Sequence, residues 1–340
     1  MTYSIDLATV FPGSPKAGVA PSERLRGVRV AVSPDARLHF SVLVPSGFTV
    51  RLPGPLEGAP GQMLSAVDSP SADAEVSVLV DEVPREVSPA DWVTDRLAAA
   101  GHTMIAARRR NEPSGASGDL LTRVVLASGP HLARTNTVKD GARIFAVTCR
   151  AREDRFPDLA DDFFAVLASF TLLAPERAPV AEPLASFTAI HPAVVGFRYP
   201  QSWQSENERA DLDAQDVRLD ALHEGRCAGR VYMQARLPGH GRRARLVNDF
   251  VERMRAEGMD LPGPIDLAET AVPEGFERAS MGSVLSSRAG APAEVRIATF
   301  ENEAAVVLVA VRGPSHASSP YWWAVNKRAF DLVVESLHAI

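Results

Sequence analysis

Short apolar segments that end in proline and an aromatic residue occur twice along this chain. The first is Phe40-Ser-Val-Leu-Val-Pro-Ser-Gly-Phe48, and the second is Phe197-Arg-Tyr-Pro-Gln-Ser-Trp203. Short apolar runs bounded by Pro, Gly and Ser are typical of strands that end in turns. We therefore expect strands at 40–44 and 48–52, and we interpret each copy as the opening strand and turn of one domain.

Alternation of apolar and polar residues predicts most of the remaining strands. Residues 75–83, Glu-Val-Ser-Val-Leu-Val-Asp-Glu-Val, alternate as a half-buried strand does, whereas 53–62 is rich in Pro and Gly and is expected to be a loop. Further strands are predicted at 103–109, 119–127, 132–138 and 143–150, and in the second half within 195–205, then at 216–223, 229–237, 275–279, 283–288, 293–300 and 304–312.

Two helices are predicted in each half, from apolar positions spaced by three and four residues. The first begins at Ser88-Pro89, where Ser can cap and Pro fits the first turn, and it ends before Gly101. The others begin at Pro157, at 243 and at Ser319-Pro320. The residues expected to face inward are Trp92, Val93 and Leu97, then Leu159, Phe163, Val166, Leu167 and Phe170, then Leu246, Val247, Phe250, Val251 and Met254, and finally Phe330, Val333, Val334 and Leu337.

The two halves match at four anchors that occur in the same order. The anchors are 44–48 with 199–203, 92–101 with 249–258, 139–150 with 301–312, and 163–170 with 330–337, at offsets of 155, 157, 162 and 167. A steadily growing offset is what loop insertions in the second copy would produce. The pattern therefore indicates an internal duplication.

The repeat predicts four parts in the chain. These are an irregular N-terminal lead-in at 1–38 with an edge strand around 27–32, a first domain at 39–173, a Pro-rich linker at 174–186 and a second domain at 187–340. Strands joined by hairpins favour an antiparallel sheet, and one-sided amphipathic helices need such a sheet to cover. We therefore predict the α+β class, with two similar domains, each a twisted antiparallel β-sheet flanked by α-helices.

Composition narrows the class of protein. The chain of 340 residues is 46% hydrophobic and carries a net charge of −6, so charge gives no reason to expect a nucleic acid or an anionic membrane as partner. Cys149 and Cys227 are expected to be reduced and buried. The N-terminus lacks the pattern of a secretion signal, and no run approaches a membrane span. A cytoplasmic location is the simplest expectation.

No residue pattern predicts a catalytic, metal or cofactor site. The eight histidines form no metal-binding pair at helical spacing, and neither Cys-x-x-Cys, His-Glu-x-x-His nor Gly-x-Ser-x-Gly is present. We predict no cofactor and no small-molecule substrate. An enzyme remains the least favoured hypothesis, with a site at the domain junction that would bring together His191, Asp211, Asp213, Asp216 and His223.

The order of elements resembles the Mog1/PsbP-like fold. The residues that carry the resemblance are the opening motif, apolar-x-apolar-Pro-x-x-aromatic, and the closing motif, Phe-x-x-apolar-apolar-x-Ser-Phe/Leu, in both halves. That group includes PsbP, Mog1, bacterial DcrB-like proteins and the Eag-type chaperones of type VI secretion effectors. The resemblance implies binding of other proteins, and it provides no shared catalytic residues. An Eag-type chaperone embraces apolar helices of an effector, which a duplicated chain could do with two linked domains.

These observations favour a non-catalytic, cytoplasmic protein-binding module, either a chaperone or an adaptor. The alternative is a structural subunit of a larger protein assembly. The candidate partner-binding residues are Tyr321, Trp322 and Trp323, because Tyr and Trp are favoured at interface hot spots, although packing of the last helix onto its sheet, or of one domain on the other, is the more common reason for such a cluster. The other large side chains, Trp92, Trp203, Met233 and Met254, are predicted to lie in the core.

Overall fold

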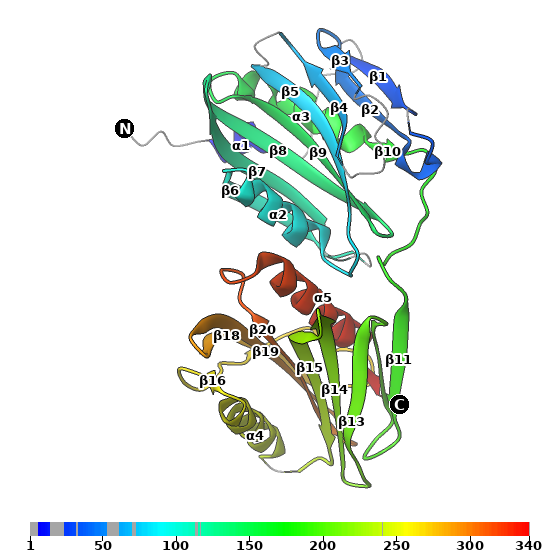
Figure 1. Cartoon of the computed structure of the whole chain (residues 1–340), viewed down its shortest axis with the longest axis vertical. Coiled ribbons are helices and arrows are strands. Elements are labelled where there is room, and N and C mark those ends of the chain that lie inside the picture. Colours follow the sequence, from blue (N-terminus) through cyan, green and yellow to red (C-terminus); the bar gives the residue numbers. More distant parts are fainter. Residues whose placement is uncertain are drawn as a thin grey trace. The chain divides into compact units, whose positions relative to one another are not determined.

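A computed structural model describes residues 6–13, 24–31, 33–52, 61–69, 73–112, 115, 117–239 and 241–339. The chain divides into two compact units (Figure 1). The first comprises residues up to Pro84 together with Ser88–Ala181, and the second comprises Arg85–Val87 with Glu182–Ile340. No helix among the described residues is long and apolar enough to cross a membrane.

Antiparallel strands and a few helices build the first unit. Its elements are α1 (Leu7–Val10), β1 (Leu25–Val30), the 3₁₀ turn η2 (Ala36–Leu38), β2 (Phe40–Pro45), β3 (Thr49–Arg51), β4 (Gln62–Val67), β5 (Ala74–Glu82), α2 (Pro89–Ala99), β6 (Thr103–Arg110), β7 (Ser117–Leu126), β8 (Gly129–Asp140), β9 (Arg143–Arg152), α3 (Phe156–Ser169) and β10 (Thr171–Leu172). A small sheet has the order β1-β2-β10, and a seven-stranded sheet has the order β3-β4-β5-β9-β8-β7-β6.

The second unit repeats this arrangement. Its elements are β11 (Leu184–Ala189), β12 (Val195–Pro200), β13 (Trp203–Ala210), β14 (Ala214–His223), β15 (Arg226–Arg236), α4 (Arg242–Ala256), β16 (Met259–Asp260), β17 (Ala268–Glu269), β18 (Arg278–Arg288), β19 (Ala291–Glu301), β20 (Val306–Pro314), α5 (Pro320–Ser336) and β21 (His338–Ala339). The small sheet has the order β11-β12-β21, and the large sheet has the order β13-β14-β15-β20-β19-β18-β16, with β17 beside β18.

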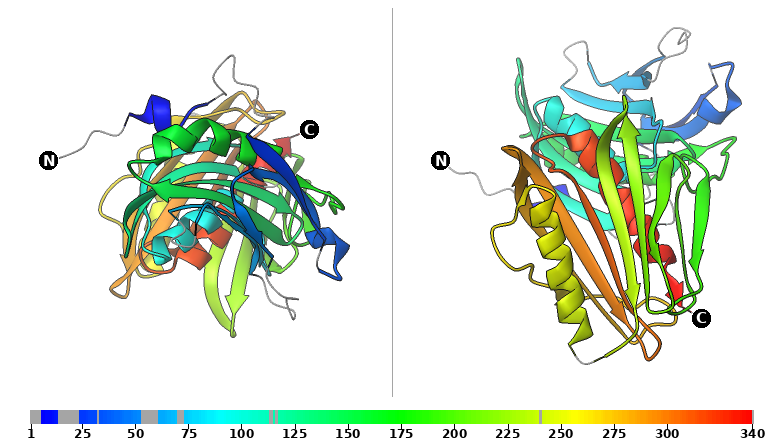
Figure 2. Two further views of the ribbon diagram at one scale, coloured as in Figure 1. Left: turned by 90° about the horizontal axis from the view of Figure 1, so that it is seen from above. Right: turned by 60° about the horizontal axis from the view of Figure 1, so that its bottom comes forward.

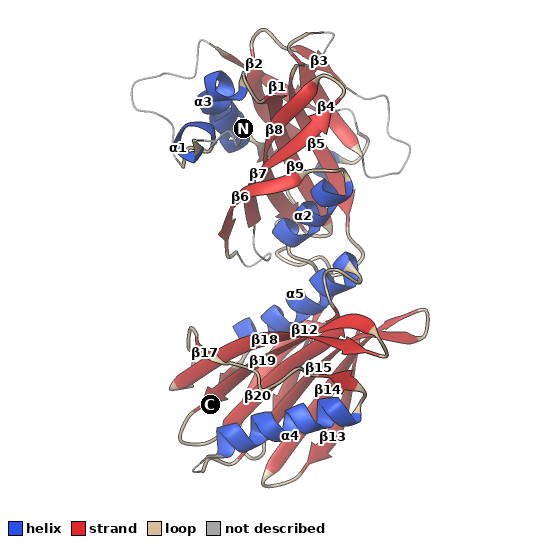
Figure 3. Cartoon of the chain, turned by 90° about the vertical axis from the view of Figure 1, so that its left-hand side faces the viewer, coloured by secondary structure: helices blue, strands red, loops and turns tan. Residues whose placement is uncertain are grey.

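Strand for strand, the two units have the same topology, and β17 is the one described addition in the second. All the described strand pairs are antiparallel. In each unit one helix covers each face of the large sheet, α2 and α3 in the first and α4 and α5 in the second (Figures 2 and 3). The predicted α+β class with two similar antiparallel domains is confirmed.

One face of the first unit's sheet forms an apolar core with α3. Every second residue of β5, Val76, Val78 and Val80, lies in this core together with buried residues of α3 such as Phe163 and Val166. The small sheet adds to this core through β2, which packs against α3. The alternate residues of β5 face α2 instead. Alternation along the strand therefore places apolar side chains on one face of the sheet and a mixture of polar and apolar side chains on the other.

The structure adds strands where the apolar pattern was misleading. β4 lies where no strand was expected, because Met63 and Leu64 are both fully buried at a β-bulge and the strand does not alternate. β18 is one continuous strand rather than the two segments predicted at 275–279 and 283–288. The edge strand predicted around 27–32 is present as β1, which pairs with β2 of the first unit, whereas β11 begins inside the range predicted as a linker.

Helix α5 approaches its sheet closely at two glycines. A Cβ on Gly229 would lie 1.8 Å from Oδ1 of Asn326, and one on Gly313 would lie 2.1 Å from its Nδ2. Asn326 is buried on α5, and its amide donates a hydrogen bond to the carbonyl of Ala228 at 3.0 Å. Glycine at both positions therefore leaves room for the buried side chain of Asn326 between α5 and the strands β15 and β20.

Gly229→Ala is expected to lower the stability of the protein by about 1–3 kcal/mol, because the added methyl group must displace the buried side chain of Asn326 and break its hydrogen bond to Ala228. Thermal and urea unfolding followed by circular dichroism measure the change. Gly263→Ala serves as the control, since nothing lies within 4 Å of its Cβ position. Equal stability of the two variants would contradict the close packing of α5.

Candidate functional site: a pocket beneath helix α2

The second face of the first unit's sheet is lined by mixed side chains. Glu75, Ser77, Leu79 and Asp81 alternate with the core valines of β5 and point toward the layer of α2. Helix α2 contacts β6, β7 and β8, so the part of this face over β5 and β9 is less covered. Leu79 is 45% exposed, which is unusual for a leucine in the middle of a central strand.

A pocket of about 350 Å³ lies between this face and α2. Its volume falls at the lower end of the range of sites that hold small molecules or inserted side chains. The main contributors are Ser77, Leu79 and Asp81 of β5, Trp92, Val93, Arg96 and Leu97 of α2, Ala100 and His102 after that helix, Thr135 of β8, and Ile144, Ala146, Thr148 and Arg150 of β9.

Two ion pairs, Arg150–Glu75 and Arg96–Asp81, form part of the pocket wall. Arg150 donates to Glu75 through Nη2 at 2.6 Å, and Glu75 also accepts the hydroxyl of Ser65. Asp81 accepts from Arg96 at 2.8 Å and from the indole nitrogen of Trp92 at 3.1 Å. The wall thus combines apolar surface with charges that are already paired.

Two polar groups of the pocket are desolvated. Among the described residues, the buried Nε of Arg150 has no hydrogen-bond partner. The side chain of His102 contacts the hydroxyl of Thr122 at 2.9 Å, and burial, followed by the charge of Arg150, lowers the pKa of His102. His102 is therefore a neutral side chain at physiological pH.

The second unit has an equivalent place, identified by strand register and by helix ends. Glu75 lies opposite Arg150 in the first unit, as Arg230 lies opposite Arg312 in the second. Helix α2 ends at Ala100 with φ −82° and ψ 8°, and α4 ends at Glu257 with φ −80° and ψ 7°. Each of these residues precedes a glycine in the left-handed region, with φ 83° and 84°. Ala100 and Glu257 are thus structural counterparts.

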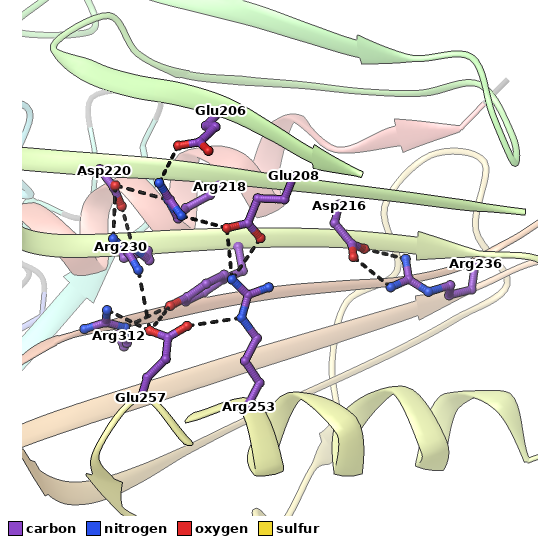
Figure 4. A network of polar contacts seen from close by, with 11 residues as sticks. Glu206, Glu208, Asp216, Arg218, Asp220, Arg230, Arg236, Arg253, Glu257 and Arg312 are labelled. Carbon is purple, nitrogen blue, oxygen red and sulfur yellow. Dashed lines mark hydrogen bonds and ion pairs between the residues drawn. The ribbon is translucent and has the colours of Figure 1, made fainter. Parts of the chain in front are cut away.

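Side chains of the second unit fill the equivalent place. Arg312 donates to the hydroxyl of Tyr232 through Nε and pairs with Glu257 through Nη2, both at 2.9 Å (Figure 4). Tyr232 donates to Glu257 at 2.9 Å, and Arg253 contacts Glu257 at 3.1 Å. The network continues through ion pairs of Glu206, Glu208, Arg218, Asp220 and Arg230.

The groups around Glu257 lower the pKa of its carboxyl group. Burial alone would raise the pKa of this carboxyl, but hydrogen bonds from Tyr232 and Arg253 and the charge of Arg312 hold it below its usual range. Below this network, Tyr232 packs edge-on against Phe250 at 5.4 Å between ring centres, in a cluster that includes Met254 and Leu308.

Smaller residues at the counterpart positions open the first unit's pocket. Position by position, Ser77 replaces Tyr232, Val93 replaces Phe250, Ala100 replaces Glu257, Ala146 replaces Leu308 and Thr135 replaces Ile297. All five first-unit residues line the pocket. The same scaffold therefore has an open site in one unit and a filled one in the other.

The predicted partner-binding residues lie at the start of α5, and all three are half-buried. Trp323 donates from its indole nitrogen to Glu294 at 2.6 Å and lies edge-on to His316 at 4.9 Å. The rings of Tyr321 and Trp322 lie 5.3 Å apart, and Trp322 also lies 5.1 Å from His223. Trp323 therefore anchors the helix to its sheet, and the role of this cluster in partner binding stays a prediction.

The residues named for an enzyme site lie in ion pairs, in a ring contact or at the surface. Asp216 pairs with Arg236 at 2.5 Å, Asp211 pairs with Arg209 at 2.6 Å, and His223 stacks on Trp322. His191 and Asp213 are exposed. No group of three or more His, Cys, Asp or Glu side chains in the described part of the chain is arranged to hold a metal ion.

Several core predictions hold and two do not. Trp203, Met233 and Met254 are buried, whereas Trp92 is half-buried and lines the pocket. Both cysteines are free, but Cys227 is exposed, contrary to the expectation of burial. Sequence reasoning missed the pocket, although aligning the halves at offsets of 155, 157 and 162 would have shown small residues in the first where the second has large ones.

Comparison with known proteins gives similarities of structure alone. No family model and no curated protein matches the chain. The solution structure of cyanobacterial PsbP from Synechocystis matches 47% of this chain and 98% of its own, at 20% identity and a TM-score of 0.32. The T6SS immunity protein TplEi from Pseudomonas aeruginosa matches 86% of this chain and 97% of its own, at 12% identity and a TM-score of 0.24.

A third match is the structure of the Tle4–Tli4 complex, which covers 85% of this chain and 93% of the matched chain, at 12% identity and a TM-score of 0.22. These TM-scores are all below 0.5, so none of the matches assigns a function. At this TM-score the PsbP match carries no argument for the family of this chain. The finer assignment to DcrB-like or Eag-type proteins stays a prediction.

Replacing Glu257 by Gln is expected to destabilise the protein by about 1–3 kcal/mol at pH 7, because three charged hydrogen bonds are weakened. The pKa of Glu257 is lower in the folded protein than in the unfolded chain, so its contribution is present above about pH 4.5 and disappears as the pH falls through the folded-state value. Urea unfolding at several pH values should show the wild-type advantage shrinking toward acid.

Glu252→Gln on the same helix provides the matched control, since Glu252 is 70% exposed and pairs only with Arg255 among the ion pairs described for it. That variant should resemble the wild type at every pH. A loss for Glu257→Gln that does not depend on pH would count against the network.

Proposed function

We propose that this chain is a non-catalytic protein-binding module, a chaperone or an adaptor, built from an internal duplication. The identical strand order of the two units, and the position of all four sequence anchors on equivalent elements, support the duplication. In this proposal the second unit serves as the solid part of the scaffold, and the first unit contributes the binding site.

The observation that carries the proposal is the open pocket beneath α2. Its wall presents Leu79, Trp92 and Leu97 beside charges that are paired within the wall. An apolar side chain entering such a pocket leaves no ion pair broken and buries apolar surface, as anchoring residues do at protein interfaces. A partner that offers apolar side chains from one face of a helix therefore suits the site.

The resemblance to Eag-type chaperones suggests the kind of partner and its setting. A secretion-system effector with apolar helices is the partner class that we propose, with binding in the cytoplasm. The pocket would hold one anchoring side chain of that helix, while neighbouring residues of the partner lie across β5 and α2.

Leu79→Arg is expected to abolish partner binding, because a charged side chain would occupy the mouth of the pocket. Wild-type and variant protein are used to capture partners from native lysate of the source organism, and the bound polypeptides are identified by mass spectrometry. We expect a dominant polypeptide with the wild type and at least a tenfold loss with Leu79→Arg, the effect of about 1.4 kcal/mol.

The matched control is Val125→Arg, since Val125 is 74% exposed on β7 of the same unit and is absent from the pocket wall. This variant should capture as much partner as the wild type, and both variants should melt near the wild-type temperature. Equal capture by all three proteins would refute the proposed site.

A further inference from the structure

We propose that the pocket beneath α2 binds a phenol group, delivered as a tyrosine side chain of the partner. The inference rests on the proposed function for the source of the group, whereas the chemistry of the group follows from the pocket alone. The second unit holds its own tyrosine, Tyr232, at the equivalent place and thereby shows which group the scaffold accommodates.

Two equivalent arginines differ between the units in the partner of their Nε atoms. In the second unit, Nε of Arg312 donates to the hydroxyl of Tyr232 at 2.9 Å. In the first unit, the same atom of Arg150 is buried and has no partner among the described residues. A buried donor without a partner is costly, so a ligand acceptor gains more than an ordinary hydrogen bond once the Arg150 side chain, which is 25% exposed, turns Nε toward the pocket.

Strand register shows that Ser77 occupies, in the first unit, the position that Tyr232 has in the second. Ser77 lies opposite Thr148 as Tyr232 lies opposite Ala310, two residue pairs along the register from the two arginines and on the same face of the sheet. Ser77 carries no ring, and both Ser77 and Thr148 line the pocket. The space that a phenol ring occupies in the second unit is therefore part of the open pocket in the first.

An aromatic ring bound in the pocket would lie beside residues of α2. Tyr232 meets the ring of Phe250 and the guanidinium of Arg253, which lies 4.7 Å from its ring centre. Their counterparts on α2 are Val93 and Arg96, and both line the pocket. An aromatic ring would thus find an apolar contact and a cation on the helix side, the same two neighbours in kind.

The Glu75–Arg150 pair in the pocket wall favours a ligand with a hydroxyl group over one with a carboxylate. Tyr232 donates its proton to Glu257, and the first unit has Ala100 at that position. Glu75, paired with Arg150, is the carboxylate that can accept a proton there. A phenol can accept from Arg150 and donate to Glu75, whereas an anionic ligand would be repelled by Glu75.

The test compares ligands that differ by one oxygen. N-acetyl-L-tyrosine amide and N-acetyl-L-phenylalanine amide are titrated into the full chain, with binding followed by NMR and calorimetry. We expect the tyrosine amide to bind at least about tenfold more tightly, since a site built for a hydroxyl discriminates against the analogue that lacks it. Equal affinities, or binding of neither, would overturn the inference.

Two variants locate the effect. Arg150→Met should remove the preference for tyrosine, and Arg152→Met, on the same strand but 43% exposed and paired with Asp154, should keep it. Ser77→Tyr should abolish binding of both amides and raise the melting temperature, because the new ring occupies the pocket. A Ser77→Tyr protein that still binds tyrosine amide would contradict the location.

A third ligand separates this inference from the proposed function. p-Cresol carries the phenol without a peptide backbone, so stronger binding of p-cresol than of the tyrosine amide would overturn the peptidyl source. If the tyrosine preference is found while Leu79→Arg leaves lysate capture unchanged, the phenol pocket stands and the proposed protein partner fails.

Discussion

Each large sheet of this protein has two faces to cover, and strict alternation along its strands decides what each face offers. Residues at even positions of β5 lie in the apolar core beneath α3, and residues at odd positions face α2. A one-residue slip of register would exchange the valines with Glu75 and Asp81 and place charges in the core. The two faces therefore cannot change independently of the strand pairing, but the side chains on one face can change without disturbing the other.

That separation explains how two units with one topology come to differ. The core faces of both units are apolar, with Val76 and Val78 in the first matched by Val231 and Met233 in the second. The opposite faces have diverged: one holds a network of arginines and carboxylates above an apolar cluster, and the other holds a pocket. Stability from the shared core leaves the second face available for binding, where a pocket costs packing energy.

Much of the fold could be predicted from the sequence because local signals agreed with the final packing. Gly101 and Gly258 follow the two equivalent helices in the left-handed region, and the alternating segment 75–83 forms β5. The strand β4 could not be predicted, because its bulge buries Met63 and Leu64 together and removes the alternation. The pocket could not be predicted for another reason. It depends on the relative sizes of residues that are far apart in the sequence and are brought together only by strand register and helix position.

The comparison of Arg150 with Arg312 also shows why motif searches found no chemistry in this chain. Neither arginine belongs to a sequence motif, and each lies in an ordinary antiparallel strand. They differ in the residue that lies two pairs away on the same face: a tyrosine that accepts a hydrogen bond from Nε in one unit, and a serine that makes no such contact in the other. A duplicated chain contains its own reference for such a site, because the filled copy shows which group the open copy lacks.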